Sequence, residues 1–292
     1  MRVHPDQWND RLQRIRALGL NAIQVYVPWN LHEMYQGKAF NYGQVTLKRI
    51  GSNLISTLTQ IQEACVSSTD PLTFEQLDYP YGYVLYTTSL SSSGGKNLST
   101  PNIRDYGYVY VNNVFQGMLL RNKTWITINA AQPGDILRIL VENQGRDNIG
   151  GGTYNHLDYK GLHNGVTLDG INLHNWFQCG INLTKASIDS LSTTFFEENR
   201  IPEKAASTPG VYVGQFTASQ LEDTFFNSTG WGKGQLFING YNLGRYWALP
   251  GPQMTLYVPK PYIQPTNTVL LIELLGGQQT DVNFVDQAIW KS

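Results

Sequence analysis

The first twenty residues carry apolar side chains at the spacing of a helix. The chain enters this stretch at Pro5, which suits the first turn of a helix, and leaves it at Gly19, which suits a helix end. A largely apolar run of strand length over residues 21–27 follows, and it is typical of a strand buried on both faces of a parallel barrel. The repeats that would complete such a barrel are missing. The side chains at helical spacing are those of Trp8, Leu12, Ile15 and Leu18.

Between Val45 and Cys65 apolar residues again recur every three or four positions. Gly51 interrupts this pattern and lowers its helix propensity. Two interpretations therefore stay open for this stretch, a helix or a loose linker. The repeating residues are Leu47, Ile50, Leu54, Leu58 and Ile61.

Beyond Pro71 the pattern changes to short apolar strands separated by turn residues about every dozen positions. This spacing is typical of an all-β sandwich or jelly roll. A glycine-rich stretch, residues 150–165, divides two series of strands, and we place a domain boundary near residue 170. The predicted strands are Tyr83–Ser89, Gly107–Val111, Val114–Leu120, Trp125–Asn129, Ile136–Glu142, Trp176–Cys179, Val211–Thr217, Gln235–Ile238, Met254–Val258 and Val269–Leu275.

Two pairs of turn residues predict β-hairpins. Asn239-Gly240 lies between apolar residues, and Asn-Gly is the strongest short hairpin signal because both residues tolerate positive φ. Asn112-Asn113 separates two predicted strands, and asparagine tolerates the same backbone conformation. We therefore expect antiparallel pairing on both sides of each pair.

The composition supports a folded protein with substantial cores. Of the 292 residues, 41% are hydrophobic and 12% aromatic. The net charge of -1 gives no electrostatic footprint for nucleic acid or an anionic membrane, so neither is an expected partner. The apolar run Val269–Leu275 is far shorter than the roughly 20 residues of a membrane-spanning helix. The first residues hold no apolar segment of signal-peptide length.

Two cysteines and four sequons bear on the cellular compartment. Cys65 and Cys179 could pair or could remain buried free thiols, because two cysteines do not define a disulfide framework. The sequons permit a glycosylated protein but do not by themselves decide the compartment. These candidate glycosylation sites are Asn97, Asn122, Asn182 and Asn227.

Two segments resemble a known enzyme family. Residues 19–33 read Gly-Leu-Asn-Ala-Ile-Gln-Val-Tyr-Val-Pro-Trp-Asn-Leu-His-Glu, and they closely resemble the second unit of the TIM barrel in the glycoside hydrolase family 35 β-galactosidases. Residues 233–247 read Lys-Gly-Gln-Leu-Phe-Ile-Asn-Gly-Tyr-Asn-Leu-Gly-Arg-Tyr-Trp and are similar to the family's C-terminal β-domain signature. The barrel segments that carry the family's general acid and nucleophile have no counterpart here.

The resemblance implies a mainly β chain. We expect two jelly-roll or galactose-binding-like β-sandwich domains, preceded by a helix and a strand left from a TIM barrel. The barrel remnant would span residues 1–44, a linker or helix 45–70, the first β-domain 71–170 and the second 171–292. About 250 residues are typical of the barrel, so the remnant is too short to form one.

The family's activity is one that this chain is expected to lack. Family members are retaining enzymes that remove terminal β-linked galactose, and such enzymes need two carboxyl groups roughly 5 Å apart. Glu33 alone stands at a strand end where a barrel would aim a catalytic group, and in the family that position belongs to the pocket rim. We therefore predict no catalytic residue. The alternative is a non-enzymatic β-sandwich that binds carbohydrate or another protein.

The resemblance also sets the expected partners and compartment. A galactoside-type carbohydrate is the expected ligand, bound weakly or not at all by this chain, and association with a full-length relative is a second expectation. The family is lysosomal or secreted. The sequence contains no nucleotide-binding or other cofactor motif, and we expect no cofactor. His156, His163 and His174 lack metal-ligand spacing and cysteine partners, so no metal site is predicted.

Aromatic residues supply the candidate sugar-binding groups. Tyr26 matches a family residue that contacts the galactose ring. Trp231 and Tyr241 lie near the Asn239-Gly240 hairpin and are candidates for stacking on a sugar. The interpretation that we favour is that this aromatic cluster fills the sandwich core, with Tyr246 and Trp247 mostly buried. The neighbouring Arg245 is expected to pair with a buried carboxylate or with carbonyls.

Overall fold

The computed structural model describes residues 8–17, 39–91, 94–146, 158–163, 165–197 and 208–291. The chain forms two compact units, residues 1–38 and residues 39–292. In the first unit the predicted helix is confirmed as α1 (Trp8–Ala17), where Arg14 and Asp10 form an ion pair of 2.9 Å one helical turn apart. The strand predicted at residues 21–27 lies outside the described residues.

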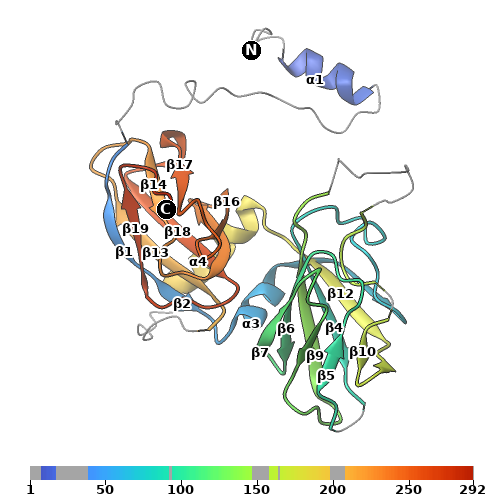
Figure 1. Cartoon of the computed structure of the whole chain (residues 1–292). Helices are drawn as coiled ribbons and strands as arrows, with labels where there is room; N and C mark the ends of the chain where they lie inside the picture. The colour runs from blue at the N-terminus through green and yellow to red at the C-terminus, as the bar shows by residue number, and fades with distance from the viewer. Residues whose placement is uncertain are drawn as a thin grey trace. The chain divides into compact units, whose positions relative to one another are not determined.

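The described residues of the second unit form four antiparallel sheets, which confirms a mainly β fold (Figure 1). Two of them form the first β-domain. The larger sheet has the order β3-β12-β4-β9-β6-β7, with β3 (Gln62–Ser68), β12 (Trp176–Ile181), β4 (Tyr83–Ser89), β9 (Ile136–Glu142), β6 (Tyr106–Val111) and β7 (Val114–Leu119). The smaller sheet has the order β11-β10-β5-β8, with β11 (Ile171–Asn172), β10 (Thr167–Leu168), β5 (Asn97–Ser99) and β8 (Trp125–Thr127).

The other two sheets form the second β-domain. The larger has the order β16-β15-β18-β13-β2, with β16 (Tyr241–Trp247), β15 (Lys233–Ile238), β18 (Thr266–Glu273), β13 (Gly210–Thr217) and β2 (Lys48–Ile50). The smaller has the order β1-β19-β14-β17, with β1 (Gly43–Thr46), β19 (Asp281–Val285), β14 (Thr224–Asn227) and β17 (Thr255–Val258).

Short helices connect these strands. They are α3 (Leu54–Leu58), η2 (Thr59–Ile61), α4 (Lys185–Glu197) and η3 (Lys260–Tyr262). Asn53 caps α3, since its side chain accepts a hydrogen bond of 2.9 Å from Ser56 N. Of the stretch between residues 45 and 65, only the part covered by α3 and η2 is helical. Helix α4 was not predicted. None of the described helices is long and apolar enough to cross a membrane.

The central strands of the two large sheets, such as β4 and β18, are buried on both faces, because their side chains alternate between two cores. On β4, Val84 and Tyr86 face the small sheet of their own domain, whereas Tyr83 and Leu85 enter a core that both β-domains share. We call this second cluster the shared core. It comprises Ile50, Leu54, Ile55, Leu58, Ile61, Tyr83, Leu85, Tyr108, Tyr110, Leu140, Ile181, Ile188, Leu191, Val211, Val213, Phe237, Leu270, Ile272 and Leu274.

The β-domains draw on chain segments that differ from the predicted boundaries. Strand β12 pairs with β3 and β4, so the large sheet of the first β-domain continues through Ile181, beyond residue 170. Strands β1 and β2 pair with β19 and β13, so residues 43–50 complete sheets of the second β-domain and are not a linker. The physical reason is pairing over long sequence distances, which leaves no mark in the local apolar pattern.

The hairpin predictions are confirmed. Asn112 and Asn113 have φ of 48° and 67° and join β6 to β7. Asn239 and Gly240 have φ of 51° and 79° and join β15 to β16. Both turns have positive φ at both central residues, which suits the right-handed twist of the flanking strands.

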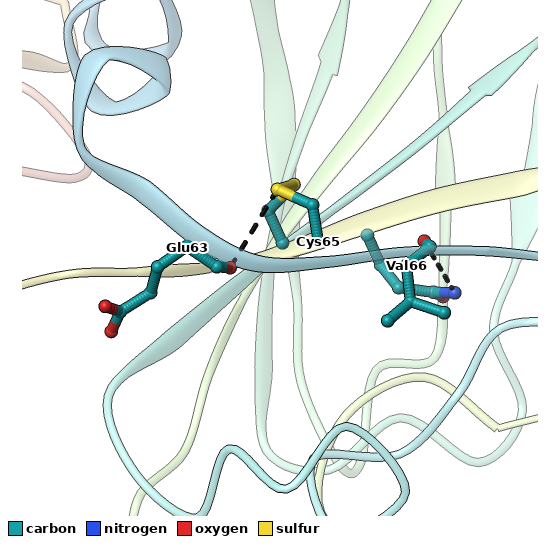
Figure 2. Close-up of a disulfide and its surroundings, with 5 residues drawn as sticks. Glu63, Cys65 and Val66 are labelled. Atoms are coloured by element: carbon teal, nitrogen blue, oxygen red, sulfur yellow. Dashed lines mark hydrogen bonds between the residues drawn. A yellow bond between two sulfur atoms is a disulfide. The ribbon is translucent and has the colours of Figure 1, made fainter.

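Cys65 and Cys179 form a disulfide that links β3 to β12 in the large sheet of the first β-domain (Figure 2). Cys65 is exposed and Cys179 is buried. The cysteines face each other where the register of the two strands shifts, between Gln178 and Gly180. Of the two states left open by the sequence, the paired one is present. A disulfide is typical of proteins that fold in an oxidising compartment.

A buried charge cluster crosses the shared core. Glu142 on β9 is fully buried and pairs with Lys233 on β15. Glu142 also accepts a hydrogen bond of 2.6 Å from the Tyr108 hydroxyl, and Arg245 Nε lies 3.3 Å from Glu142 Oε1. The prediction that Arg245 pairs with a buried carboxylate is confirmed.

Replacing both cysteines, Cys65→Ala with Cys179→Ala, should lower the free energy of unfolding by about 2 to 4 kcal/mol, because the disulfide restricts the unfolded chain. It closes a loop between residues separated by 114 positions. Denaturant unfolding of the oxidised protein and of the double variant measures the difference. The unsubstituted protein unfolded in reductant should match the variant, and equal midpoints for the oxidised protein and the variant would contradict the prediction.

Buried tyrosines should make the folded state lose stability above about pH 10. Burial raises the pKa of the Tyr83, Tyr86, Tyr108, Tyr110 and Tyr246 hydroxyls above its ordinary value. The unfolded chain therefore releases these protons before the folded chain does. Their stabilising contribution is intact below the unfolded-state pKa and is lost as the pH rises toward the folded-state pKa. Unfolding midpoints measured across this alkaline range test the slope.

Two phenylalanine substitutions separate this effect from general alkaline damage. Among the described residues, the Tyr110 hydroxyl has no hydrogen-bond partner, so Tyr110→Phe removes one titrating group without removing a bond. It should reduce the slope by about 1.4 kcal/mol per pH unit. Tyr81 is exposed, and Tyr81→Phe should leave the slope unchanged. The same slope in all three proteins would show that buried tyrosines are not the cause.

Candidate functional site

The predicted aromatic cluster lies mostly in the core of the second β-domain. Trp231 is 4% exposed, and its indole N–H donates a 3.0 Å hydrogen bond to the Asp281 carbonyl. Tyr246 is buried and donates a 2.7 Å hydrogen bond to Glu273. Trp247 is mostly buried as well, with a minor part of its surface exposed. Trp231 therefore presents no open face on which a sugar could stack.

Tyr241 is the more exposed candidate, at 39%. Its ring is stacked on Tyr262 with centroids 4.5 Å apart, and Lys185 Nζ lies 5.3 Å from its centroid. These contacts compete with a sugar for the faces of the ring. The third candidate, Tyr26, lies outside the described residues, as does Glu33.

The sequons differ in how accessible their asparagines are. Asn97 and Asn122 are exposed. Asn182 is partly buried, and its side-chain N–H donates a 2.7 Å hydrogen bond to Glu63. Asn227 is partly buried in β14, where its side-chain oxygen accepts a 3.0 Å hydrogen bond from Thr229 N.

A cavity of about 570 Å³ opens in the first β-domain, a site that no sequence pattern indicated. Its volume falls within the range of roughly 300 to 1,000 Å³ that is typical of small-molecule sites. The lining combines an exposed aromatic ring with hydroxyl, amide, carboxylate and imidazole groups. The lining residues are Pro71, Thr73, Glu75, Gln76, Asn102, Tyr159 and His163.

Reciprocal hydrogen bonds fix one wall of this cavity. Thr73 N donates to the Gln76 side chain at 2.8 Å, and Gln76 N donates to the Thr73 hydroxyl at 3.2 Å. Phe74 N donates to the Lys160 carbonyl at 2.9 Å, and Lys160 N donates to Glu75 Oε2 at 3.0 Å. These bonds join the wall to the segment that carries Tyr159, so the cavity is preorganised.

An ion network lies beside the cavity. Lys160 is fully buried, and its ammonium group lies 3.0 Å from Asp105 and 2.6 Å from Asp158. Arg121 pairs with the same two carboxylates. Partial burial opposes ionisation of Asp158, but its hydrogen bonds and attraction to Lys160 and Arg121 outweigh that effect and hold its pKa below the ordinary value. Because these charges satisfy one another, the site is better suited to binding than to proton transfer.

The histidines form individual contacts. His163 Nε2 lies 3.1 Å from the Tyr159 carbonyl, and His174 Nδ1 lies 3.0 Å from Asp70. His156 lies outside the described residues. Within the ranges that the structure describes, no group of three or more His, Cys, Asp or Glu residues could hold a metal ion.

Sequence comparison with known families identifies three matching regions. Residues 1–56 match the glycosyl hydrolases family 35. Residues 71–182 match the first all-beta domain of beta-galactosidase, and residues 209–268 match its galactose-binding domain. The first of these β-domain matches ends beside β12, in agreement with the observed sheet.

Individual relatives agree with these family matches. The chain is 35% identical to beta-galactosidase of Bos taurus over 279 residues, which cover 87% of this chain and 42% of the relative. It is 35% identical to human beta-galactosidase over 254 residues (80% and 37%), and 35% identical to mouse beta-galactosidase-1-like protein over 263 residues (86% and 39%). The chain thus spans about two fifths of the length of these relatives.

Among solved structures, a GH2 beta-galacturonidase from Eisenbergiella tayi bound to glycerol aligns with 83% of this chain and 38% of that chain, at 11% identity and a TM-score of 0.26. No argument about fold or ligand follows from so low a score. The family matches and the curated relatives, by contrast, agree along the chain: it belongs to glycoside hydrolase family 35, the family of these β-galactosidases.

Proposed function

We propose that this chain is a β-galactosidase-family polypeptide that does not hydrolyse terminal β-linked galactose on its own. Its two β-domains correspond to the part of full-length relatives that acts as a scaffold around the catalytic barrel. The shared core and the buried charge cluster support this role, because they join the two β-domains without using an accessible catalytic group.

The observation that supports this proposal is the short connection between the barrel remnant and the first strand of the β-domains. Glu33 matches the pocket rim of the family, and β1 starts at Gly43, where it pairs with β19. The intervening residues 34–42 read Met-Tyr-Gln-Gly-Lys-Ala-Phe-Asn-Tyr and contain no aspartate or glutamate. A retaining glycosidase needs a general acid and a nucleophile from two converging positions. This connection supplies neither.

The alternative function is a non-enzymatic module that binds carbohydrate or another protein. The cavity of the first β-domain favours it, because an exposed tyrosine beside amide and carboxylate groups can stack on a sugar and hydrogen-bond to its hydroxyls. Tyr159 would provide the ring, and Gln76 and Asn102 would provide the polar partners. A galactoside-type carbohydrate is the ligand that the family suggests.

A lysosomal or secreted location accompanies the proposed function. The disulfide between Cys65 and Cys179 supports passage through an oxidising compartment. The four sequons fit the same route. Association with a full-length relative is the protein partnership that a scaffold of this family would make.

The purified chain should not hydrolyse a chromogenic β-galactoside above a buffer blank, because the general acid and nucleophile segments have no counterpart in it. Product release over time, with full-length bovine β-galactosidase as the active control, measures this. Turnover that co-purifies with the chain to homogeneity would overturn the proposal.

Titration with galactose should show no saturable binding at millimolar concentrations. Trp231 is buried and the ring of Tyr241 is already stacked, so the second β-domain offers no open aromatic platform at the predicted positions. Calorimetric titration of the unsubstituted chain tests this expectation. A saturable isotherm would favour the alternative, and its loss in Tyr159→Ala but not in Tyr241→Ala would locate binding at the cavity.

A further inference from the structure

The small sheet of the first β-domain has one buried and one solvent-facing side. Leu98, Ile126 and Leu168 are paired across its strands and lie in the core. Their neighbours along the strands point to the opposite side, because successive side chains alternate. This opposite side, which we call the outer face, carries Asn97, Ser99, Trp125, Thr127 and Thr167.

Trp125 is an aromatic residue among the polar residues of this face, and it is 60% exposed. Its neighbours across the sheet are polar, since Ser99 pairs directly with Trp125 and Thr167 pairs with Ser99. The exposed indole presents a broad apolar face to solvent beside these hydroxyl groups. A sugar ring would cover it, since a sugar offers both an apolar face and hydroxyl groups.

The first residue of a sequon lies beside this indole. Asn97 pairs with Thr127, two residues along β8 from Trp125, so Asn97 and Trp125 are diagonal neighbours on the outer face. Ile128 N donates a hydrogen bond to Lys96 O, and Thr100 N donates one to Thr124 O, just outside the three paired positions. In the antiparallel ladder, Asn97–Thr127 and Ser99–Trp125 are therefore the non-hydrogen-bonded type of pair. In such pairs the strands approach more closely, and diagonal neighbours are roughly 7 to 8 Å apart, within reach of an aromatic side chain.

The Asn97 side chain is also available for modification. It is exposed, and its backbone groups, not its side chain, bond to Asp169. The sequon Asn97-Leu98-Ser99 places its serine on the same outer face. Asn182 differs, because its side-chain N–H is already bound to Glu63.

We propose that Asn97 carries an N-linked glycan whose first N-acetylglucosamine stacks on Trp125. The transfer joins Asn97 Nδ2 to C1 of the sugar and breaks the bond from C1 to the phosphate of a lipid-diphosphate-linked oligosaccharide. The lipid diphosphate is the leaving group, and the amide loses one proton to the transferase. The inference goes beyond the proposed function and requires only passage through a glycosylating compartment, which the disulfide supports.

The first test is occupancy. The full chain, directed through the secretory pathway of a eukaryotic host, should carry a glycan at Asn97 that glycopeptide mass spectrometry identifies. Asn97→Gln should lose it, and Ser99→Thr should keep it because the sequon is retained. An unmodified Asn97 in a preparation whose Asn122 is glycosylated would overturn the proposal.

The second test is the contact itself. Endoglycosidase H leaves the first sugar on asparagine, so the trimmed protein should keep the thermal stability of the intact glycoprotein. Asn97→Gln should raise the unfolding equilibrium constant by about fivefold. In Trp125→Ala, loss of the glycan should have no further effect. Equal effects of Asn97→Gln with and without Trp125 would show that the sugar does not use the indole.

Asn122 provides the matched control, because it is exposed at the turn that precedes β8. Thr124→Ala removes its sequon, and this variant should retain the coupling between Asn97 and Trp125. Oxidative footprinting gives a readout independent of stability: Trp125 should be oxidised several-fold more slowly in the protein that carries only the Asn97 glycan. Protection that follows the Asn122 glycan would overturn the assignment to Asn97.

Discussion

The carboxylate of Glu142 imposes the constraint on which the arrangement of the β-domains depends. It is buried on β9 of the first β-domain, and its cationic partners, Lys233 and Arg245, come from β15 and β16 of the second. Burial lowers the pKa of Lys233, and attraction to Glu142 opposes that effect. A buried charge without its partner costs several kcal/mol. The two β-domains must therefore meet with these strands opposed, so the cluster selects one packing of the shared core.

The surroundings of the cluster follow from the same constraint. The Tyr108 hydroxyl supplies a further hydrogen bond to Glu142, and Lys233 Nζ lies 5.2 Å from the ring of Tyr106 and 5.3 Å from that of Trp247. Aromatic faces stabilise a desolvated ammonium group. Trp247 is mostly buried, as expected, and it lies beside this cluster.

The sequence predicted strands better than it predicted domains, for a physical reason. Long apolar runs such as Tyr83–Ser89 and Ile136–Glu142 are buried on both faces and were predicted with the bounds that the structure has. Strand β3 is exposed along most of its length, so its polar sequence gave no strand signal. Residues 43–50 were assigned to the remnant and linker because their partners lie more than 150 positions away along the chain.

Functional positions were harder to predict than strands because they are defined by tertiary contacts. For Trp231, the general preference of aromatic rings for burial favoured a core position over a sugar-stacking platform. The structure shows Trp231 buried, so this preference alone gave the right prediction. The cavity brings Thr73 and Gln76 next to Tyr159 and His163, which no spacing in the sequence relates. Trp125 was predicted as a strand residue, but its exposure depends on which face of a three-residue strand meets the core.

The two-faced burial of the central strands in the large sheets also limits where this protein can interact. Both faces of β4 and β18 are occupied by cores, so these strands offer stability rather than recognition. The surfaces left for ligands or modification are the loops at the sheet ends and the solvent-facing side of the small sheets. The cavity beside Tyr159 and the outer face around Trp125 are one example of each. In both, an exposed ring lies on a rigid frame among polar groups, which is the arrangement that carbohydrate contacts require.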